Sequence, residues 1–326
     1  MYLRPLLTFV LTLLLTACGG ENSGVAGDPA SYPNKPVRVI IPFGPGGLAD
    51  VTLRLVGEPL GELLGERLVM ENRPGAGGVA ATTTMLNADP DGHTLIVLTN
   101  GTTIAESLFE DLPYNITEEL VPISAVAWFD LVLLVNPDSG YSDLQSLLAA
   151  RGDDLRIATI NPGSTQNLTA ELFKSRAGMD NATIIPYRTT PDVLGALLRG
   201  EVDLAIDAYT ALKGAIDNGQ VRPVAVTGEV RNPAMPDVPI AAEAGVEDFV
   251  VTGWNALYAR AGTDPAIIAR LNSEIAAVLA TDDIKARFSE LGVEARGNTP
   301  EAMQQRLLDD IVKWRGVIQA AGIDTL

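Results

Sequence analysis

Short apolar runs of strand length alternate with helical patterns along most of this chain, and this alternation limits the possible folds more than any other feature. Residues 37–41 form a β-branched run that Pro42 closes, and residues 94–98 and 131–135 are further buried runs. Strands separated by helical stretches of roughly 10–15 residues are typical of βαβ units with parallel sheets. The same rhythm starts again after 131–135. At roughly 150 residues per domain, 326 residues suffice for two such units, so the sequence predicts a two-lobed α/β protein.

The final part of the chain is almost wholly helical and has no sheet of its own to cover. Asp264-Pro265 and Thr299-Pro300 each place an N-cap residue before a proline at the first helical position. We therefore expect this tail to pack on an existing lobe. The apolar run at 250–259 should return the chain to that lobe.

The two lobes are predicted to be joined by two crossing strands. The run at 131–135 leaves the first lobe, and the later apolar run comes back to it. A connection of this kind permits hinge closure around a ligand. The expected division is residues 33–130 plus 251–326 for lobe one and residues 131–250 for lobe two.

Residues 1–17 are predicted to be a signal peptide. Leu6 to Ala17 is a nearly unbroken apolar run, but it is too short to cross a bilayer, which takes about 20 residues. It ends at Leu15-Thr16-Ala17-Cys18, which resembles the bacterial lipobox, in which the cysteine is acylated and becomes the new N-terminus. The alternative is an ordinary signal peptide that contains a cysteine. We expect a lipoprotein, periplasmic or on the cell surface, with residues 18–32 as a flexible tether from Cys18 to the fold.

Charge and residue usage exclude several classes of function. The chain has 41 acidic and 23 basic side chains, which gives a formal charge of −18. This charge repels a phosphate backbone at long range, so no nucleic acid is expected as a partner. A single cysteine and a single histidine rule out a disulfide framework and argue against a zinc site. We expect no metal and no cofactor.

Three polar loops follow predicted strands, at residues 43–50, 99–103 and 161–167. In open α/β sheets, ligands bind at the carboxyl ends of the strands, where helix N-termini offer free N–H groups. Any one of these loops is equally well explained as an ordinary turn or a capped helix start. Together they predict a cleft lined by hydrogen-bond donors.

An enzyme is the alternative function. Gly44-x-Gly46-x-x-Ala49 formally matches a dinucleotide fingerprint, and Glu71 could meet a ribose, which would suit an exported dinucleotide-dependent oxidoreductase. One Gly-rich match is a weak signal, however, and export removes most nicotinamide chemistry. Ser164 lacks the G-x-S-x-G elbow, and His93 is expected in a surface turn before a strand. We therefore predict that the chain is not an enzyme.

Several motifs follow one another in a fixed order from Tyr32 to the C-terminus. The most specific is Glu71-Asn72-Arg73-Pro74-Gly75-Ala76-Gly77-Gly78; Asp91-Gly92-x-Thr94, Pro186-Tyr187-Arg188 and Glu243-Ala244-Gly245 come after it. In this order they resemble the Bug family, the extracytoplasmic solute-binding receptors of tripartite tricarboxylate transporters. The resemblance covers essentially the whole mature chain.

The resemblance implies a Venus-flytrap periplasmic-binding-protein fold with a discontinuous first lobe. Such a receptor, expected as a monomer, captures a small organic anion such as a di- or tricarboxylate between its lobes. It then delivers the anion to the membrane permease subunits of the transporter. In this family, backbone amides, hydroxyls and waters hold the ligand carboxylates. Carried over to this chain, the ligand-binding residues are Phe43, Gly46, Gly47, Asp50, Asn100, Gly101, Thr102, Gly163, Ser164, Thr165, Asn167, Tyr187 and Asp207.

Two departures from the family pattern fall at the expected pocket. Asn167 stands where relatives commonly have histidine, and Thr189-Thr190-Pro191 stands where they commonly have glycines. Both bear on the identity of the ligand. Arg188 either pairs with a ligand carboxylate or braces the surface between the lobes.

Overall fold

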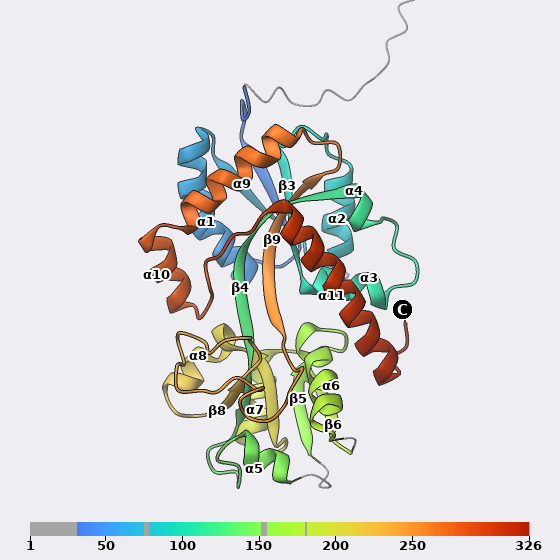
Figure 1. Cartoon of the computed structure of the whole chain (residues 1–326), viewed down its shortest axis with the longest axis vertical. Coiled ribbons are helices and arrows are strands. Elements are labelled where there is room, and N and C mark those ends of the chain that lie inside the picture. Colours follow the sequence, from blue (N-terminus) through green and yellow to red (C-terminus); the bar gives the residue numbers. More distant parts are fainter. Residues whose placement is uncertain (1–30, 75–77, 151–154, 180, 326) are drawn as a thin grey trace, which may run out of the picture.

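Two sheets that share one long strand form the frame of the protein (Figure 1). The computed structural model describes residues 31–74, 78–150, 155–179 and 181–325. The strand order is β2-β1-β3-β9-β4-β7-β5-β6, with β8 also paired to β4. Cys18 and the predicted signal peptide lie outside the described residues.

Sheet A contains β1 (Val37–Ile41), β2 (Leu68–Asn72), β3 (Thr94–Thr99), β9 (Thr252–Arg260) and the first part of β4 (Leu120–Val135). β1 is parallel to β2 and β3, and β9 is antiparallel to β3 and β4. Alternate residues of β1 enter different cores: Val39 packs with α1 and α9, while Ile40 packs with α2 and α11. Because helices cover both faces, the strand is apolar throughout, as its sequence indicated. These helices are α1 (Leu48–Leu64), α2 (Val79–Leu86), α9 (Pro265–Leu279) and α11 (Pro300–Ala321).

Sheet B contains the end of β4 with β5 (Arg156–Ile160), β6 (Thr183–Tyr187), β7 (Leu204–Ala208) and β8 (Arg222–Val226). β5 is parallel to β6 and β7, whereas β7 and β8 are antiparallel to β4. Helices cover both of its faces as well. One face packs on α5 (Leu144–Ala149) and α6 (Thr165–Ala177), and the other on α7 (Thr190–Leu198) and α8 (Tyr209–Asp217).

β4 changes partners part-way along its length. It pairs with β9 as far as Asp130 and with β7 and β8 from Leu131 onward. At this point Thr227 links the two segments of the chain that cross between the sheets. Its Oγ1 accepts from Leu131 N at 2.9 Å and donates to Val251 O at 2.6 Å. The change falls at the predicted lobe boundary. That the parts on either side of this boundary move as separate lobes stays a prediction.

The last helix extends beyond sheet A. The first half of α11 packs on sheet A through Met303 and Leu307, but Trp314 and Val317 belong to the same core as α6 of sheet B. Figure 1 shows α11 running from the upper half toward the lower half. The tail therefore contacts both halves, whereas we expected it to pack on the first. α10 (Asp282–Glu290) lies between α9 and α11 in the chain.

Two local expectations were wrong. The polar segment that follows β3 is not a loop, because Asn100 begins α3 (Asn100–Leu108), with Thr99 as its N-cap; a short α4 (Ile116–Glu119) follows. His93 is not at the surface: its side chain is 7% exposed, because the Tyr32 ring packs edge-on against it at 4.9 Å. The Asn34 N–H also donates to His93 Nε2 at 3.3 Å.

Candidate functional site

The turn from β1 into α1 presents unused backbone donors. Gly46 adopts a positive φ of 83°, and Gly47 is the N-cap of α1 in an extended conformation. No side chain caps this helix start. The first-turn N–H groups of α1 are thus left for another acceptor, and the helix dipole favours an anion there. Phe43, at the start of the turn, is 40% exposed.

Asp50 holds this turn in shape. Its Oδ2 accepts from Gly46 N at 2.9 Å, and its Oδ1 accepts from Arg54 Nε and Asn72 Nδ2, each at 3.0 Å. Burial raises the pKa of Asp50, but these hydrogen bonds, led by that from Arg54, outweigh burial and hold the pKa below its usual value. The carboxylate is therefore already satisfied by groups of the protein, and it organises the turn.

The start of α3 lies beside this turn at the end of the adjacent strand β3. Asn100 is buried: its Oδ1 accepts from Trp254 N at 2.8 Å, and its Nδ2 lies 3.4 Å from Asp310 Oδ2. Thr99 Oγ1 accepts from Gly101 N at 3.1 Å, and Thr102 Oγ1 accepts from Thr99 N at 3.3 Å. The side chains of Asn100 and Thr102 thus fix the helix start, while Gly101 is partly exposed.

The loop from β5 into α6 brings the second sheet toward the first. Gly163 has a φ of +73°, and its N–H donates to Asn167 Oδ1 at 3.1 Å. Ser164 caps α6 by accepting from Asn167 N at 3.1 Å, and Thr165 is the first helical residue. A Cβ on Gly163 would lie 2.7 Å from Leu108 Cδ2 in α3. The 161–167 loop therefore contacts the helix that follows β3 of sheet A.

The buried carboxylate of Asp207 accepts hydrogen bonds from residues at or after the ends of three strands of sheet B. Asp207, at the end of β7, accepts from Gln166 Nε2 at 2.9 Å, from Thr190 Oγ1 at 2.7 Å and from Ala208 N at 2.7 Å. Burial raises the pKa of Asp207. Sequence reasoning proposed Asp207 but missed Gln166, although Gln166 lies inside the 161–167 segment.

The start of α8 forms a second contact between the halves. No side chain caps the start of α8, as is also the case at the start of α1. Tyr209 is buried, and its ring occupies the space where Gly292 would carry a side chain. Thr210 Oγ1 donates to Leu291 O at 2.7 Å. The sequence signal that was overlooked is the junction of β7 and α8, directly after Asp207.

Tyr187 ends β6 on the same edge of sheet B, and Arg188 follows it. Tyr187 O accepts from Asn161 N at 2.8 Å, and the side chain of Tyr187 is partly exposed. Arg188 is exposed, and both roles considered for it remain predictions. The residues proposed from the sequence thus form two groups, one at the strand ends of each sheet, and direct contact of each residue with a ligand stays a prediction.

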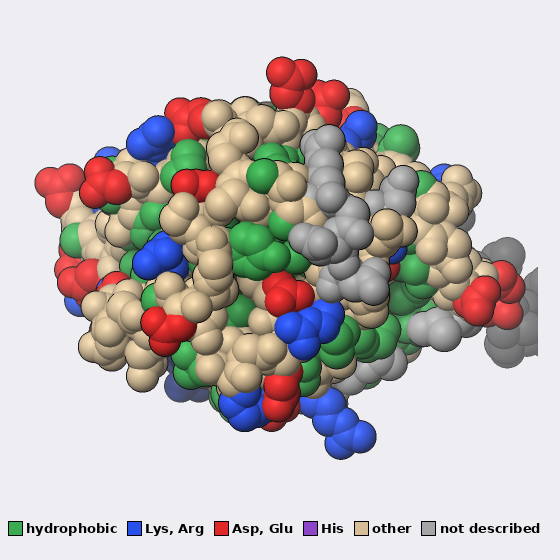
Figure 2. Space-filling view, turned by 90° about the horizontal axis from the view of Figure 1, so that it is seen from below, with side chains coloured by type: hydrophobic (Ala, Val, Ile, Leu, Met, Phe, Trp, Pro, Cys, Tyr) green, Lys and Arg blue, Asp and Glu red, His purple; other side chains and the backbone are tan. Residues whose placement is uncertain are grey.

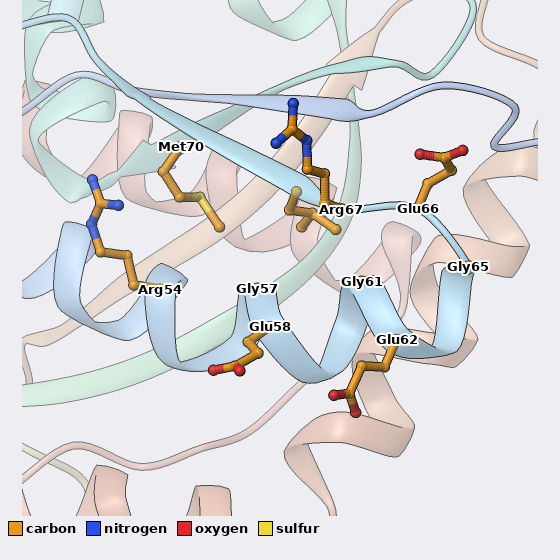
Figure 3. A pocket seen from close by; sticks show the side chains of 10 residues that line it. Arg54, Gly57, Glu58, Gly61, Glu62, Gly65, Glu66, Arg67 and Met70 are labelled. Carbon is orange, nitrogen blue, oxygen red and sulfur yellow. The ribbon is translucent and has the colours of Figure 1, made fainter.

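Two hollows of the described surface lie away from these strand ends. One, of about 620 Å³, lies between α1 and β2, and Figure 3 shows its lining with Arg54, Arg67 and Met70. Gly57 has a packing role, since a Cβ on it would meet Met70 Cε at 2.3 Å. The other, of about 1010 Å³, lies between α6 and α11. Neither includes a residue proposed as ligand-binding.

Glu71, which could have met a ribose, is paired within the protein. Its carboxylate lies 2.5 Å from Arg73 Nη2 and 3.5 Å from Arg38 Nη1. Both partners are arginines, so binding a ribose diol would require breaking ion pairs. The geometry does not favour the dinucleotide alternative.

Asp130 is a partly buried acid at the point where the chain crosses between the sheets. Burial first, and then the nearby carboxylates of Glu294 and Glu229, raise its pKa from 3.8 to about 6, against hydrogen bonding from Asn232 and the charge of Arg296. Below pH 3.8 the group is protonated in both the folded and the unfolded state. As the pH rises from 3.8 to 6, the unfolded chain ionises first, and the folded state loses stability relative to it.

We therefore expect Asp130→Asn to stabilise the protein at pH 8, by at most about 3 kcal/mol in the free energy of unfolding, and to have little effect near pH 4. Urea unfolding at both pH values measures this. Asp111→Asn, at an exposed position, removes the same charge as a control. An equal effect of Asp130→Asn at both pH values would show that ionisation of Asp130 is not the cause.

Comparison with known proteins identifies the family. A family model described as the tripartite tricarboxylate transporter family receptor, TctC, matches residues 52–323. The chain belongs to this family. The resemblance noted in the sequence is confirmed, and because the family consists of solute-binding receptors, so is the prediction that the chain is not an enzyme.

Solved structures agree with the receptor fold. The periplasmic binding protein BugD is 29% identical, with a TM-score of 0.74 over 90% of this chain and 100% of its own. MatC from Rhodopseudomonas palustris, with bound malate, is 31% identical, with a TM-score of 0.72 over 88% and 100%. R. palustris Rpa4515 with adipate is 31% identical, with a TM-score of 0.78 over 90% and 100%. The receptor has the mixed α/β periplasmic-binding-protein fold, as predicted.

Proposed function

We propose that this receptor captures a small carboxylate between its two halves and delivers it to the permease of a tripartite tricarboxylate transporter. The observation that carries the proposal is the turn from β1 into α1, where an uncapped helix start follows Gly46 and Gly47. Free N–H groups at a helix N-terminus bind carboxylates without a basic side chain. The contact of Gly163 with Leu108 supports a second wall from sheet B.

A net charge of −18 is compatible with an anionic ligand. Charges farther away than a Debye length of about 8 Å are largely screened at physiological salt. Figure 2 shows one end of the molecule, on which acidic and basic side chains are interspersed. We expect the local backbone dipoles at the start of α1 to outweigh these distant, screened charges.

The two halves are proposed to move as lobes. Lobe one would comprise residues 33–130 plus 251–326, and lobe two residues 131–250. The exchange of partners along β4 at Asp130 and Leu131 supports this division. Thr227, which joins both crossing chains, would act as the pivot. We further propose that the receptor works as a monomer.

A thermal-shift screen tests the function. The panel contains di- and tricarboxylates, aromatic acids and acidic amino acids, with NAD and NADP as the arms for the alternative. A ligand at 100 times its Kd should stabilise the folded state by about 2.7 kcal/mol, which gives a clear rise in Tm. At least one carboxylate should produce this rise and the nucleotides none. A rise with NAD or NADP alone would contradict the proposal.

We also propose that the receptor is anchored to a membrane through lipid on Cys18. No helix in the part of the chain that the structure describes is long and apolar enough to cross a bilayer. The lipobox-like segment and the polar residues 18–32 support the anchor.

Expressed in a bacterium, the wild-type protein should sediment with membranes. Cys18→Ser should release it into the soluble fraction or leave an uncleaved precursor, because the acyl chains of a lipoprotein supply the membrane affinity. Cell fractionation and intact-mass measurement check this. Fully soluble wild-type protein with a free thiol would contradict the anchor.

A further inference from the structure

The carboxylate of Asp207 is bonded only by neutral donors. Its side chain is 1% exposed at the end of β7, and its three donors are the amide of Gln166, the hydroxyl of Thr190 and the backbone N–H of Ala208. Within the described residues, no lysine or arginine forms an ion pair with it, unlike Asp50 on sheet A, which is paired with Arg54. Among the described residues, Asp207 is therefore a buried acid that no cation pairs with.

Asp207 determines whether Thr190 and Gln166 can donate hydrogen bonds to a ligand or accept them from it. An ionised carboxylate only accepts hydrogen bonds, so the hydroxyl hydrogen of Thr190 is committed to Asp207. The remaining lone pairs of Thr190 Oγ1 can only accept. In the same way, Gln166 must turn Nε2 toward Asp207, and its Oε1 then points elsewhere as an acceptor.

These acceptors lie where a ligand would meet sheet B. Thr190 is the first residue of α7, after β6, and Gln166 lies in the first turn of α6, after β5. Both side chains are partly exposed. A second ligand carboxylate placed here would face two acceptors and a buried negative charge, which disfavours it. A ligand hydroxyl or ammonium group would instead find two acceptors.

We propose, on the basis of the proposed function, that the Asp207 cluster recognises a hydrogen-bond donor on the ligand. The ligand class is then a dicarboxylate with a hydroxyl or amino substituent. Its carboxylate binds at the start of α1, and its substituent binds Thr190 and Gln166. Of the relatives named above, MatC holds the hydroxylated malate and Rpa4515 the unsubstituted adipate, so related receptors accommodate both classes.

Calorimetry with matched ligands tests this inference. The four-carbon set is succinate, malate and aspartate; the five-carbon set is glutarate, 2-hydroxyglutarate and glutamate. In at least one set, a substituted acid should bind wild-type receptor 10-fold or more tightly than the unsubstituted acid. Equal or tighter binding of the unsubstituted acids would overturn the inference while leaving the carboxylate receptor intact. Absence of any heat from all six, together with a negative carboxylate screen, would overturn both.

Two variants test whether the preference for substituted acids comes from Asp207 and its partners. Asp207→Asn can donate to Thr190 and so frees its hydroxyl hydrogen, and Thr190→Val removes the acceptor without touching Asp207. Each should reduce the preference for the substituted acid at least 5-fold. Asp192→Asn removes the same charge from the exposed first turn of α7 and should keep the preference. If Asp207→Asn does not fold, Thr190→Val decides, and a preference retained in a folded variant would overturn the inference.

Discussion

Gly47→Trp is expected to abolish carboxylate binding while leaving the empty protein nearly as stable as wild type. Gly47 has a φ of −72°, which any residue can adopt, and the nearest atom to an added Cβ is Gly44 O at 3.7 Å. A side chain therefore fits without strain in the protein. The indole would cover the first amides of α1 and exclude the ligand, with an expected loss of affinity of about 100-fold or more, which corresponds to roughly 2.7 kcal/mol.

Calorimetry for binding and thermal melting for the ligand-free protein measure the two effects. Gly140→Trp is the matched control, because Gly140 has no atom within 4 Å of an added Cβ and is exposed in the turn that follows β4. It should bind ligand as wild type does. Wild-type affinity in Gly47→Trp would place the carboxylate away from the start of α1.

Asp310→Ala is expected to cause the largest loss of stability, about 3–5 kcal/mol in the free energy of unfolding. Asp310 is 4% exposed on α11, and its Oδ2 accepts from Trp254 Nε1 at 2.6 Å and Arg306 Nε at 2.9 Å. Asn100 Nδ2 lies 3.4 Å from the same oxygen. Truncation would leave a cation and two buried donors without this acceptor.

Urea unfolding at neutral pH measures this loss. Asp309→Ala provides the control, since Asp309 is the exposed neighbour on the same helix and, among the described residues, accepts only from Gln305 at 2.8 Å. Its effect should stay within about 0.5 kcal/mol. Because Asn100 begins α3, weakened ligand binding in any Asp310→Ala protein that remains folded is also expected. Equal stability of the two variants would contradict the role assigned to Asp310.

Elements with strong local signals were predictable from the sequence. The β-branched run of β1 agrees with the structure, as do the helix starts at Asp264 and Thr299. α3 was missed because Asn100, Gly101 and the threonines beside them have low helix propensity. A capping box between Thr99 and Thr102 and the burial of Ile104 compensate.

Long-range pairing limited the rest of the fold prediction. The sequence indicated only 131–135 of β4, whereas the strand begins at Leu120. Pro122 and Ser124 interrupt the apolar pattern of its first half, and β-bulges accommodate them in the pairing with β9. That partner lies more than a hundred residues away in the chain, so no local pattern could reveal it.

The candidate site shows the same limit. Asp50 and Asp207 were singled out from the sequence as ligand-binding residues, but their carboxylates are bonded to Arg54 and Asn72, and to Gln166 and Thr190, respectively. Most of these partners come from other elements of the fold. Residue types at strand ends thus indicate where a ligand binds, whereas the division between binding and positioning depends on tertiary contacts.

A crystal structure of the receptor with its carboxylate bound tests the central claim most directly. We predict ligand density between the two sheets, with a carboxylate within hydrogen-bond distance of the first amides of α1 and the hydroxyl or amino substituent of the ligand against Gln166 and Thr190. Ligand held by only one sheet, or in the groove between α6 and α11, would contradict it.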